Sequence, residues 1–355
     1  MQEEIFFGSK PTKFLKEKFE NIHFPLQATI ELTCSCNLHC IHCYARPGIK
    51  AHDMTTSEVK IILDKLYDND TLNIAFTGGE IFTRKDFKEL YLYAKNKGMI
   101  IALLSNITLL DESIIEFLKE YPPISLDTSI YGLTRETYEK VTQVKGSFDL
   151  FMKNLLILKN SGLTYKVKYI ALKENFCDID NIKEFETKYN ININIFTDIT
   201  KACGEEYPLK HRLSMNQLNY IWQKYLNVDT YFKEKDSYIS KGINRWEQNY
   251  LYPCNVGYQT IFVNHEGKLQ PCISMYYHQF DLLHGDFKDG WNMINDVIDK
   301  KCTLQYKCYE CDYSEYCSHC TVKFISPLED EILIDSYECK KAKFLKKYID
   351  EYNNS

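Results

Sequence analysis

The feature that most constrains this chain is the placement of its cysteines. The sequence has 355 residues and contains 14 cysteines, which gather in two groups with only Cys177 and Cys203 between them. Thiols stay reduced in the cytosol, so clusters of them bind metal more often than they form disulfides. The distribution therefore predicts two metal-binding regions separated by an ordinary domain. The first group is Cys34, Cys36, Cys40 and Cys43, and the second is Cys254, Cys272, Cys302, Cys308, Cys311, Cys317, Cys320 and Cys339.

Length and charge narrow the class of protein further. A chain of this length corresponds to about two domains. Its net charge of −6 argues against a general nucleic-acid binder, which would normally carry a basic face. The longest clean apolar run, residues 99–104, is far shorter than the roughly 20 residues of a membrane helix. The first residues lack the basic and apolar regions of a secretory signal. We therefore predict a cytoplasmic protein that binds neither nucleic acid nor membranes.

Between the two cysteine groups, strand patterns alternate with helix patterns. This alternation predicts a parallel sheet with right-handed crossovers, open or closed into a barrel, with its chemistry at the carboxyl ends of the strands. The expected strands are residues 27–32, 72–77, 100–104, 124–130, 166–172 and 191–196, and the expected helices are 57–66, 87–96, 113–119, 148–159 and 179–188. Beyond residue 198 the alternation stops, and we expect one helix at 213–225 and a hairpin of strands 259–263 and 268–272.

The first cysteine group lies directly after the first expected strand. Cys36, Cys40 and Cys43 are spaced so that a loop can wrap all three thiols around a metal cluster. A [4Fe–4S] cluster has four irons, so three cysteines leave one iron open to a chelating cofactor. A zinc knuckle with His39 or His42 as the fourth ligand is the alternative, although the spacing fits it poorly.

This loop resembles the CxxxCxxC loop of the radical SAM superfamily, and Gly78-Gly79-Glu80 after the second strand resembles its GGE motif. The resemblance implies a partial (β/α)6 TIM-like barrel that binds S-adenosylmethionine on a [4Fe–4S] cluster held by Cys36, Cys40 and Cys43. It also implies reductive cleavage of S-adenosylmethionine to a 5′-deoxyadenosyl radical. The cofactor contacts that it implies are His42, Gly78, Gly79, Glu80, Ser105, Asn106, Ser125 and Asp127. Ordinary packing is the alternative for His42, Ser105, Asn106, Ser125 and Asp127.

The second cysteine group resembles the SPASM extension of radical SAM enzymes, although its last gap has two residues where three are usual. The resemblance implies one auxiliary [4Fe–4S] cluster on Cys308, Cys311, Cys317 and Cys339. A second would bind Cys254, Cys272 and Cys320; Cys302 supplies its fourth ligand, or an open iron accepts a substrate thiolate. The predicted division is an N-terminal extension (1–26), a radical SAM barrel (27–225), a bridging region (226–253) and a cysteine-rich SPASM domain with a β-hairpin (254–355).

SPASM-bearing relatives mostly modify peptides or proteins. The resemblance therefore implies a maturase with three [4Fe–4S] clusters that abstracts hydrogen from a ribosomally made peptide, with a thioether or another crosslink favoured. Its partners would be the substrate, an electron donor such as flavodoxin or ferredoxin, and a separate leader-binding protein, since only about 26 residues precede the first strand. The alternatives are a formylglycine-forming sulfatase maturase, a peptide epimerase and a non-catalytic metal-binding scaffold.

Two cysteines outside these ligand sets complete the expectations. Cys203 follows the last expected barrel strand, and it is the only candidate for a catalytic side chain, as a donor of a proton or a hydrogen atom. The alternative for Cys203 is a loop cysteine without a catalytic role. Cys34 precedes the cluster loop, and we interpret it as a spare loop thiol.

Overall fold

The computed structural model describes most of the chain and all of the expected barrel strands. Within the described residues, nine strands form one sheet in the order β6-β5-β4-β3-β2-β1-β7-β8-β9. The described residues are 23–45, 52–202, 205–228, 231, 250–252, 254, 256–301, 307–317, 320–323 and 336–353.

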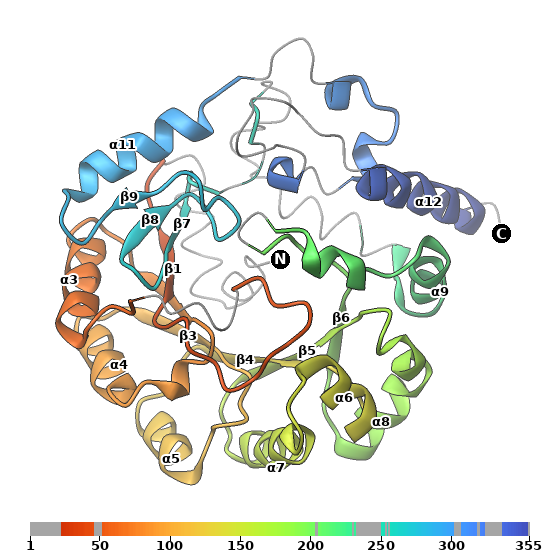
Figure 1. The fold of residues 1–355 in the computed structure, drawn as a ribbon, viewed down its shortest axis with the longest axis horizontal. Helices are drawn as coiled ribbons and strands as arrows, with labels where there is room; N and C mark the ends of the chain where they lie inside the picture. Colours follow the sequence, from red (N-terminus) through yellow and green to blue (C-terminus); the bar gives the residue numbers. More distant parts are fainter. Residues whose placement is uncertain are drawn as a thin grey trace.

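The first six strands pair in parallel, each with its neighbour in the sequence. Helices α3, α4, α5, α7 and α8 form an arc outside them, as expected for a partial barrel (Figure 1). The predicted fold class, a partial TIM-like barrel, is therefore confirmed. The strands are β1 (Gln27–Glu31), β2 (Asn73–Thr77), β3 (Ile100–Leu104), β4 (Ser125–Ile130), β5 (Tyr165–Ile170) and β6 (Ile193–Phe196). The helices between them are α3 (Thr56–Tyr67), α4 (Phe87–Asn96), α5 (Glu112–Glu120), α6 (Arg135–Thr142), α7 (Ser147–Asn160) and α8 (Ile182–Tyr189).

The helix α6 was not expected from the sequence. It has few apolar residues, so its periodicity is weak, and its start depends on a capping box in which Thr134 and Thr137 bond each other's backbone. Its buried Tyr138 and Val141 then pack it onto the barrel. Local capping and tertiary packing together decide this element.

The two faces of the barrel sheet differ in character. On β4, Leu126 and Ile130 belong to the main hydrophobic core, whereas Ser125 and Asp127 point to the opposite, inner face because strand side chains alternate. All four of these residues are buried. The inside of the partial barrel is therefore polar along the first half of β4, which suits a site for a charged cofactor.

The cysteine-rich part joins the barrel through the sheet itself. The expected hairpin consists of β7 (Thr260–Val263) and β8 (Lys268–Gln270), and β9 (Phe280–Asp281) extends it. β7 pairs in parallel with β1, while β8 and β9 follow antiparallel. The sheet thus crosses the predicted domain boundary at residue 254, and that boundary stays a prediction.

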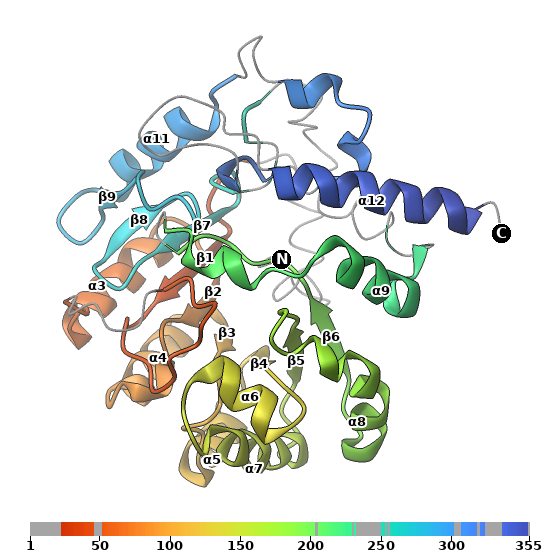
Figure 2. The ribbon, with the colours of Figure 1, turned by 45° about the vertical axis from the view of Figure 1, so that its right-hand side comes forward.

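Among the described residues, three helices cover this part of the molecule. They are α9 (Met215–Tyr225), α11 (Phe287–Ile298) and α12 (Ser336–Asn353). The long α12 lies against α9 (Figure 2), where the Tyr337 hydroxyl donates to the Leu213 carbonyl at 2.9 Å and the Tyr348 hydroxyl to the Trp222 carbonyl at 3.2 Å. None of the described helices is both long and apolar enough to cross a membrane.

Candidate active site

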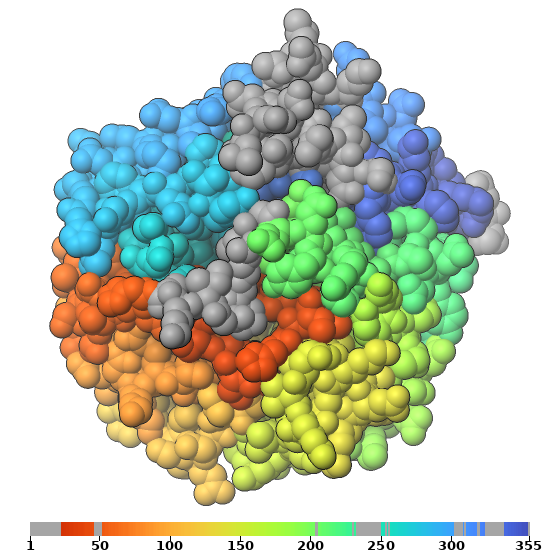
Figure 3. Space-filling model, in the orientation of Figure 1, coloured from red at the N-terminus to blue at the C-terminus, as the bar shows by residue number. Residues whose placement is uncertain are grey.

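The first three site cysteines lie on the loop that follows β1, near the centre of the face shown in Figure 3. Two neighbouring segments hold this loop through backbone hydrogen bonds. The amide of Glu80 donates to the Ser35 carbonyl at 2.8 Å, and the amide of His39 donates to the Thr142 carbonyl at 2.9 Å. The Tyr207 hydroxyl donates to the Cys43 carbonyl at 2.6 Å. The loop is therefore positioned from both sides before any metal is bound.

The thiols of Cys36, Cys40 and Cys43 lie close enough to influence one another. Burial raises the pKa of Cys40 well above its usual value, and the neighbouring thiols of Cys43 and Cys36 raise it further. Burial raises the pKa of Cys36 as well. Thiols with raised pKa values keep their protons unless a cation is present, because coordination to a metal deprotonates a thiol outright.

Donors aimed at one of these sulfurs indicate a thiolate. The Leu38 amide lies 3.4 Å from Cys36 Sγ, and Asn106 Nδ2 lies 3.7 Å from the same atom. Hydrogen bonds to cluster sulfurs are one of the means by which proteins tune iron–sulfur centres. This donor set fits a [4Fe–4S] cluster with three protein ligands.

The GGE motif lies against the cluster loop. A Cβ atom on Gly79 would lie only 2.3 Å from the Ser35 carbonyl oxygen, so no larger residue fits without moving the loop. Glycine is needed here because two backbones approach closely, not because of an unusual dihedral angle.

Glu80 is the central polar group of the site. Its side chain accepts hydrogen bonds from Ser105 Oγ at 2.8 Å and from the Asn106 amide at 2.7 Å. Burial raises the pKa of Glu80 to about 7, although these hydrogen bonds oppose the shift. A buried carboxylate of this kind favours a cationic group beside it. The structure thus brings together Glu80, Ser105, Asn106 and Cys36.

The turn after β3 is strained. Ile107 has a φ of 54°, in the left-handed region that β-branched residues rarely adopt. Its amide donates to Ser105 Oγ at 2.9 Å, and its carbonyl accepts from Asn154 Nδ2 at 2.8 Å. These hydrogen bonds hold Ile107 in its strained conformation, and Ser105 and Asn106 contact Glu80 in the same turn, as is common where strain is found at functional sites.

The predicted residues on β4 lie beside this group without a side-chain contact to Glu80. The Ser105 amide donates to the Asp127 carbonyl at 3.1 Å, which places the residue after β3 next to the middle of β4. The Asp127 carboxylate forms an ion pair with Lys168 at 3.1 Å, and Ser125 Oγ is buried without a hydrogen-bond partner among the described residues. An unpartnered buried hydroxyl calls for a bound group or an ordered water.

His42 is buried beside the cluster loop. Its ring lies 5.1 Å from that of Tyr131, and its Nδ1 has no partner within the described part of the chain. Burial, with a smaller contribution from the nearby His211, lowers the pKa of His42 to about 4. The imidazole is therefore neutral at pH 7 and presents a flat surface suited to stacking.

Three thiols of the second cysteine group also converge. Burial raises the pKa of Cys272 far above its usual value, and the neighbouring thiols of Cys320 and Cys254 raise it further. This grouping matches the ligand set implied for one auxiliary cluster, and three close thiols fit an iron–sulfur group. The fourth candidate ligand, Cys302, lies outside the described residues.

The other auxiliary set is spread over short turns and one helix. The Cys311 amide donates to the Cys308 carbonyl at 3.4 Å, Cys317 follows the turn η5 (Ser314–Tyr316), and Cys339 lies on α12. That these four cysteines share a cluster stays a prediction. Cys203, the catalytic candidate, lies outside the described residues.

Several residues of the site were not found from the sequence. Lys168 pairs with Asp127, and the ring of Tyr131 lies beside that of His42. His211 also lies near His42, and its Nδ1 is 2.6 Å from Oε1 of Glu174. The sequence did offer one indication for Lys168. It lies two residues after Lys166 on an expected strand, so the two lysines share one face of that strand.

Comparison with known proteins defines the class. Residues 30–185 match the family model described as the Radical SAM superfamily. This segment contains the three-cysteine loop, Glu80 and the strand ends around it, and the chain is an enzyme with a radical SAM domain.

The similar proteins include a bacteriocin biosynthesis protein and an AdoMet-dependent heme synthase. The chain is 26% identical over 319 residues to the antilisterial bacteriocin subtilosin biosynthesis protein AlbA of Bacillus subtilis, covering 84% of this chain and 68% of that protein. It is 24% identical over 330 residues to the AdoMet-dependent heme synthase of Methanosarcina barkeri, covering 86% and 94% of the two chains. Streptococcus suis SuiB bound to its precursor peptide SuiA has the same fold, with a TM-score of 0.69, 18% identity, and 92% and 78% coverage.

Proposed function

We propose that this enzyme installs a post-translational modification in a ribosomally made peptide. The observation that carries the proposal is the joined group of Cys36, Asn106 and Glu80, because it offers an iron site and a carboxylate to one chelating cofactor. The similarity to AlbA, a bacteriocin biosynthesis protein, supports a peptide as the substrate. A thioether or another crosslink is the modification that we favour.

When bound, the cluster and S-adenosylmethionine would supply a 5′-deoxyadenosyl radical that abstracts a hydrogen atom from the substrate. The residues of the chain bind and orient the cofactor. Glu80 would accept from its methionyl ammonium group, and the neutral His42 ring would lie against the adenine. Ser125 and Asp127 would meet the ribose or the methionyl group. The buried surroundings of these side chains exclude water from the reacting atoms.

One auxiliary cluster has only three implied cysteine ligands among the described residues, and this favours a thioether over other peptide modifications. Cys254, Cys272 and Cys320 provide three ligands, so a fourth iron position is left either to Cys302 or to a thiolate of the substrate. Iron–sulfur sites accept soft ligands readily. A substrate cysteine held in this way would be positioned for bond formation to carbon.

The test is an anaerobic assay with candidate peptides encoded next to the gene, with flavodoxin or ferredoxin as the electron donor. We expect 5′-deoxyadenosine and a peptide that has lost two hydrogens and one free thiol. The double variant Cys40→Ala/Cys43→Ala should form no 5′-deoxyadenosine, because it cannot hold the cluster. The matched control Cys177→Ala changes an exposed cysteine and should retain full turnover.

Other products would redirect the assignment. An aldehyde on a sulfatase peptide would indicate formylglycine formation, and deuterium incorporation from solvent without a mass loss would indicate epimerisation. The heme synthase is the relative whose length is covered at 94%, so turnover of an iron porphyrin with no turnover of any peptide would overturn the peptide proposal. If the wild-type protein formed no 5′-deoxyadenosine, the remaining hypothesis would be a non-catalytic scaffold that binds metal.

A further inference from the structure

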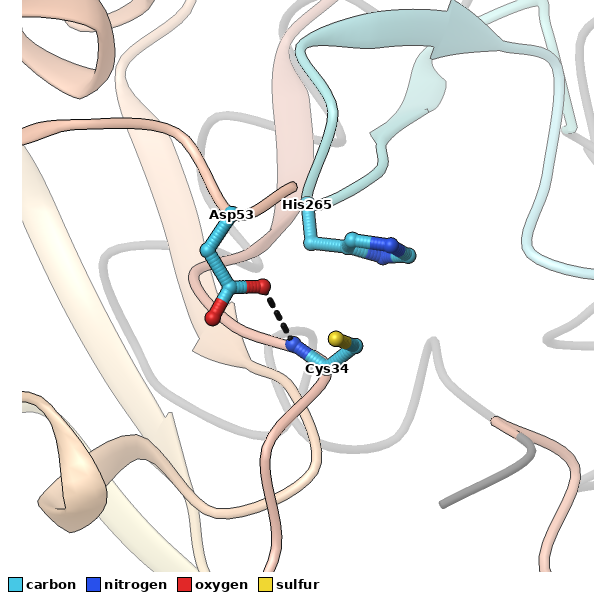
Figure 4. A group of neighbouring side chains, drawn as sticks. All are labelled: Cys34, Asp53 and His265. Atoms are coloured by element: carbon cyan, nitrogen blue, oxygen red, sulfur yellow. Dashed lines mark hydrogen bonds between the residues drawn. The ribbon is translucent and has the colours of Figure 1, made fainter. Parts of the chain in front are cut away.

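Cys34, Asp53 and His265 form a cluster outside the set of residues used above. They come from the loop after β1, the segment before α3 and the turn between β7 and β8, respectively. Their side chains gather at one point (Figure 4), and one potential ligand atom of each lies within 4.8 Å of the others. The sequence offers no spacing pattern that joins these residues, since more than 200 positions separate Cys34 from His265.

The imidazole of His265 is oriented by a carboxylate. Its Nδ1 lies 3.0 Å from Oε2 of Glu31, the last residue of β1. Its Nε2 is buried and has no hydrogen-bond partner among the described residues. A histidine that binds metal through one nitrogen commonly donates from the other to a carboxylate, which determines the tautomer and the ring orientation. The unsatisfied Nε2 is thus the atom available to a ligand.

Hydrogen bonds from the residues around the thiol hold the Asp53 carboxylate. Its Oδ1 accepts from the Cys34 amide at 2.8 Å, and its Oδ2 accepts from Thr33 Oγ1 at 2.5 Å. The Met54 amide donates to the His265 carbonyl at 2.9 Å, so the segment before α3 and the hairpin turn are joined by backbone as well. The carboxylate is therefore held beside the cysteine and the histidine, with lone pairs left for a cation.

We propose that Cys34, Asp53 and His265 bind one zinc ion, with Glu31 orienting His265 and a water molecule in the fourth position. Thiolate sulfur, imidazole nitrogen and carboxylate oxygen are the three ligand types that zinc takes in proteins. The ion would join the start of the cluster loop to the hairpin of the cysteine-rich part. This site is distinct from the iron sites and does not depend on the proposed reaction.

The test uses the reconstituted protein with its iron–sulfur clusters. After incubation with Zn²⁺ and gel filtration, we expect about one zinc per chain and a zinc K-edge absorption spectrum with one sulfur at about 2.3 Å and nitrogen or oxygen neighbours at about 2.0–2.2 Å. The variants His265→Ala and Asp53→Asn should lose the zinc and keep the iron. Glu31→Gln should weaken zinc binding by about 10–100-fold. The control His284→Ala removes an exposed histidine that pairs only with Asp281 in the same turn, and it should keep the zinc.

Three results would overturn the proposal: no retained zinc, zinc retained equally by His265→Ala and Asp53→Asn, or a shell of sulfur alone. A sulfur shell would mean that zinc had replaced iron at the other cysteines. Because Asp53→Asn preserves size and iron content reports folding, a misfolded variant would be identified as such. None of these readouts requires turnover, so they are independent of the assay for peptide modification.

Discussion

At the scale of single residues, Glu80 shows how burial creates a demand for a cation. The side chain is only 1% exposed, and its pKa is raised to about 7 mainly by burial. The unfolded chain ionises this group near its ordinary pKa, so the folded state is penalised once the carboxyl loses its proton. A cationic cofactor beside Glu80 would remove that penalty.

The sign of this effect gives a pH prediction for the protein before S-adenosylmethionine is added. A raised folded pKa contributes stability below the unfolded pKa and loses it as the pH rises through about 7. The wild type should therefore lose about 3 kcal/mol relative to Glu80→Gln between pH 4.5 and pH 8. Chemical unfolding at both pH values measures this difference. Glu116→Gln, on the surface of α5, should show no such change relative to the wild type.

Gly79 gives a second prediction at this scale. Gly79→Ala should displace the cluster loop, because the new Cβ would lie 2.3 Å from the Ser35 carbonyl oxygen. We expect loss of iron from the first cluster and of 5′-deoxyadenosine formation, measured after reconstitution. Gly98→Ala has nothing within 4 Å of its Cβ and a φ of 86°, so it should cost only about 1–2 kcal/mol of backbone strain. Full activity in Gly79→Ala would contradict the close-approach argument.

At the scale of elements, α12 is held by buried charges rather than by apolar packing alone. Lys341 and Lys323 both pair with Asp198, and Lys323 also pairs with Glu338 at 3.3 Å. Arg212 lies 3.7 Å from Glu338. Burial alone would raise the pKa of Asp198, yet the two lysines hold it well below its usual range. The network connects the segment after β6 with the residues that follow Cys320 and precede Cys339.

Breaking this network at one partner should be costly. Asp198→Asn leaves the charge of Lys341 without its anion and removes one of the two anionic partners of Lys323, so we expect a loss of about 3 kcal/mol in the free energy of unfolding. Calorimetry together with iron content would show a lower melting temperature and weaker occupancy of the auxiliary site. The exposed pair of Asp180, in the turn before α8, and Lys224, on α9, provides the control, since Asp180→Asn should change little. Equal melting temperatures for the two variants would contradict this role.

At the scale of the whole molecule, the parallel pairing of β7 with β1 makes the barrel and the cysteine-rich part share one sheet. The converging thiols of Cys254, Cys272 and Cys320 nevertheless belong to segments other than the first cluster loop. Metal occupancy at the two ends of the chain should therefore be separable.

Iron counting tests this separation. Three [4Fe–4S] clusters correspond to about 12 irons per chain, and Cys254→Ala/Cys272→Ala should leave about 8. This double variant should still form 5′-deoxyadenosine, because the loop of Cys36, Cys40 and Cys43 is intact, but it should not modify the peptide. A wild-type value of about 8 would mean that one auxiliary site does not hold a cluster, and loss of all iron in the variant would show that the sites are coupled.

Much of the fold could be predicted from the sequence because local patterns encode it. Period-two and helical spacing indicated all six barrel strands, and β3 begins and ends at the expected residues, 100 and 104. The family resemblance implied Glu80, Ser105 and Asn106 as cofactor contacts, and hydrogen bonds join these three residues in the structure. Helix α6 was missed because capping and burial, rather than apolar periodicity, stabilise it.

The sequence by itself determined the repeating order of strands and helices, the cluster loop, and the number and grouping of the cysteines, since each depends on residue types at short spacing. The tertiary structure alone decided the pairing of β7 with β1, the ion pair of Lys168 with Asp127, and the meeting of Cys34, Asp53 and His265. These contacts join residues far apart in the chain. Their formation depends on strand register and on how the elements pack, and no local pattern of side chains carries that information.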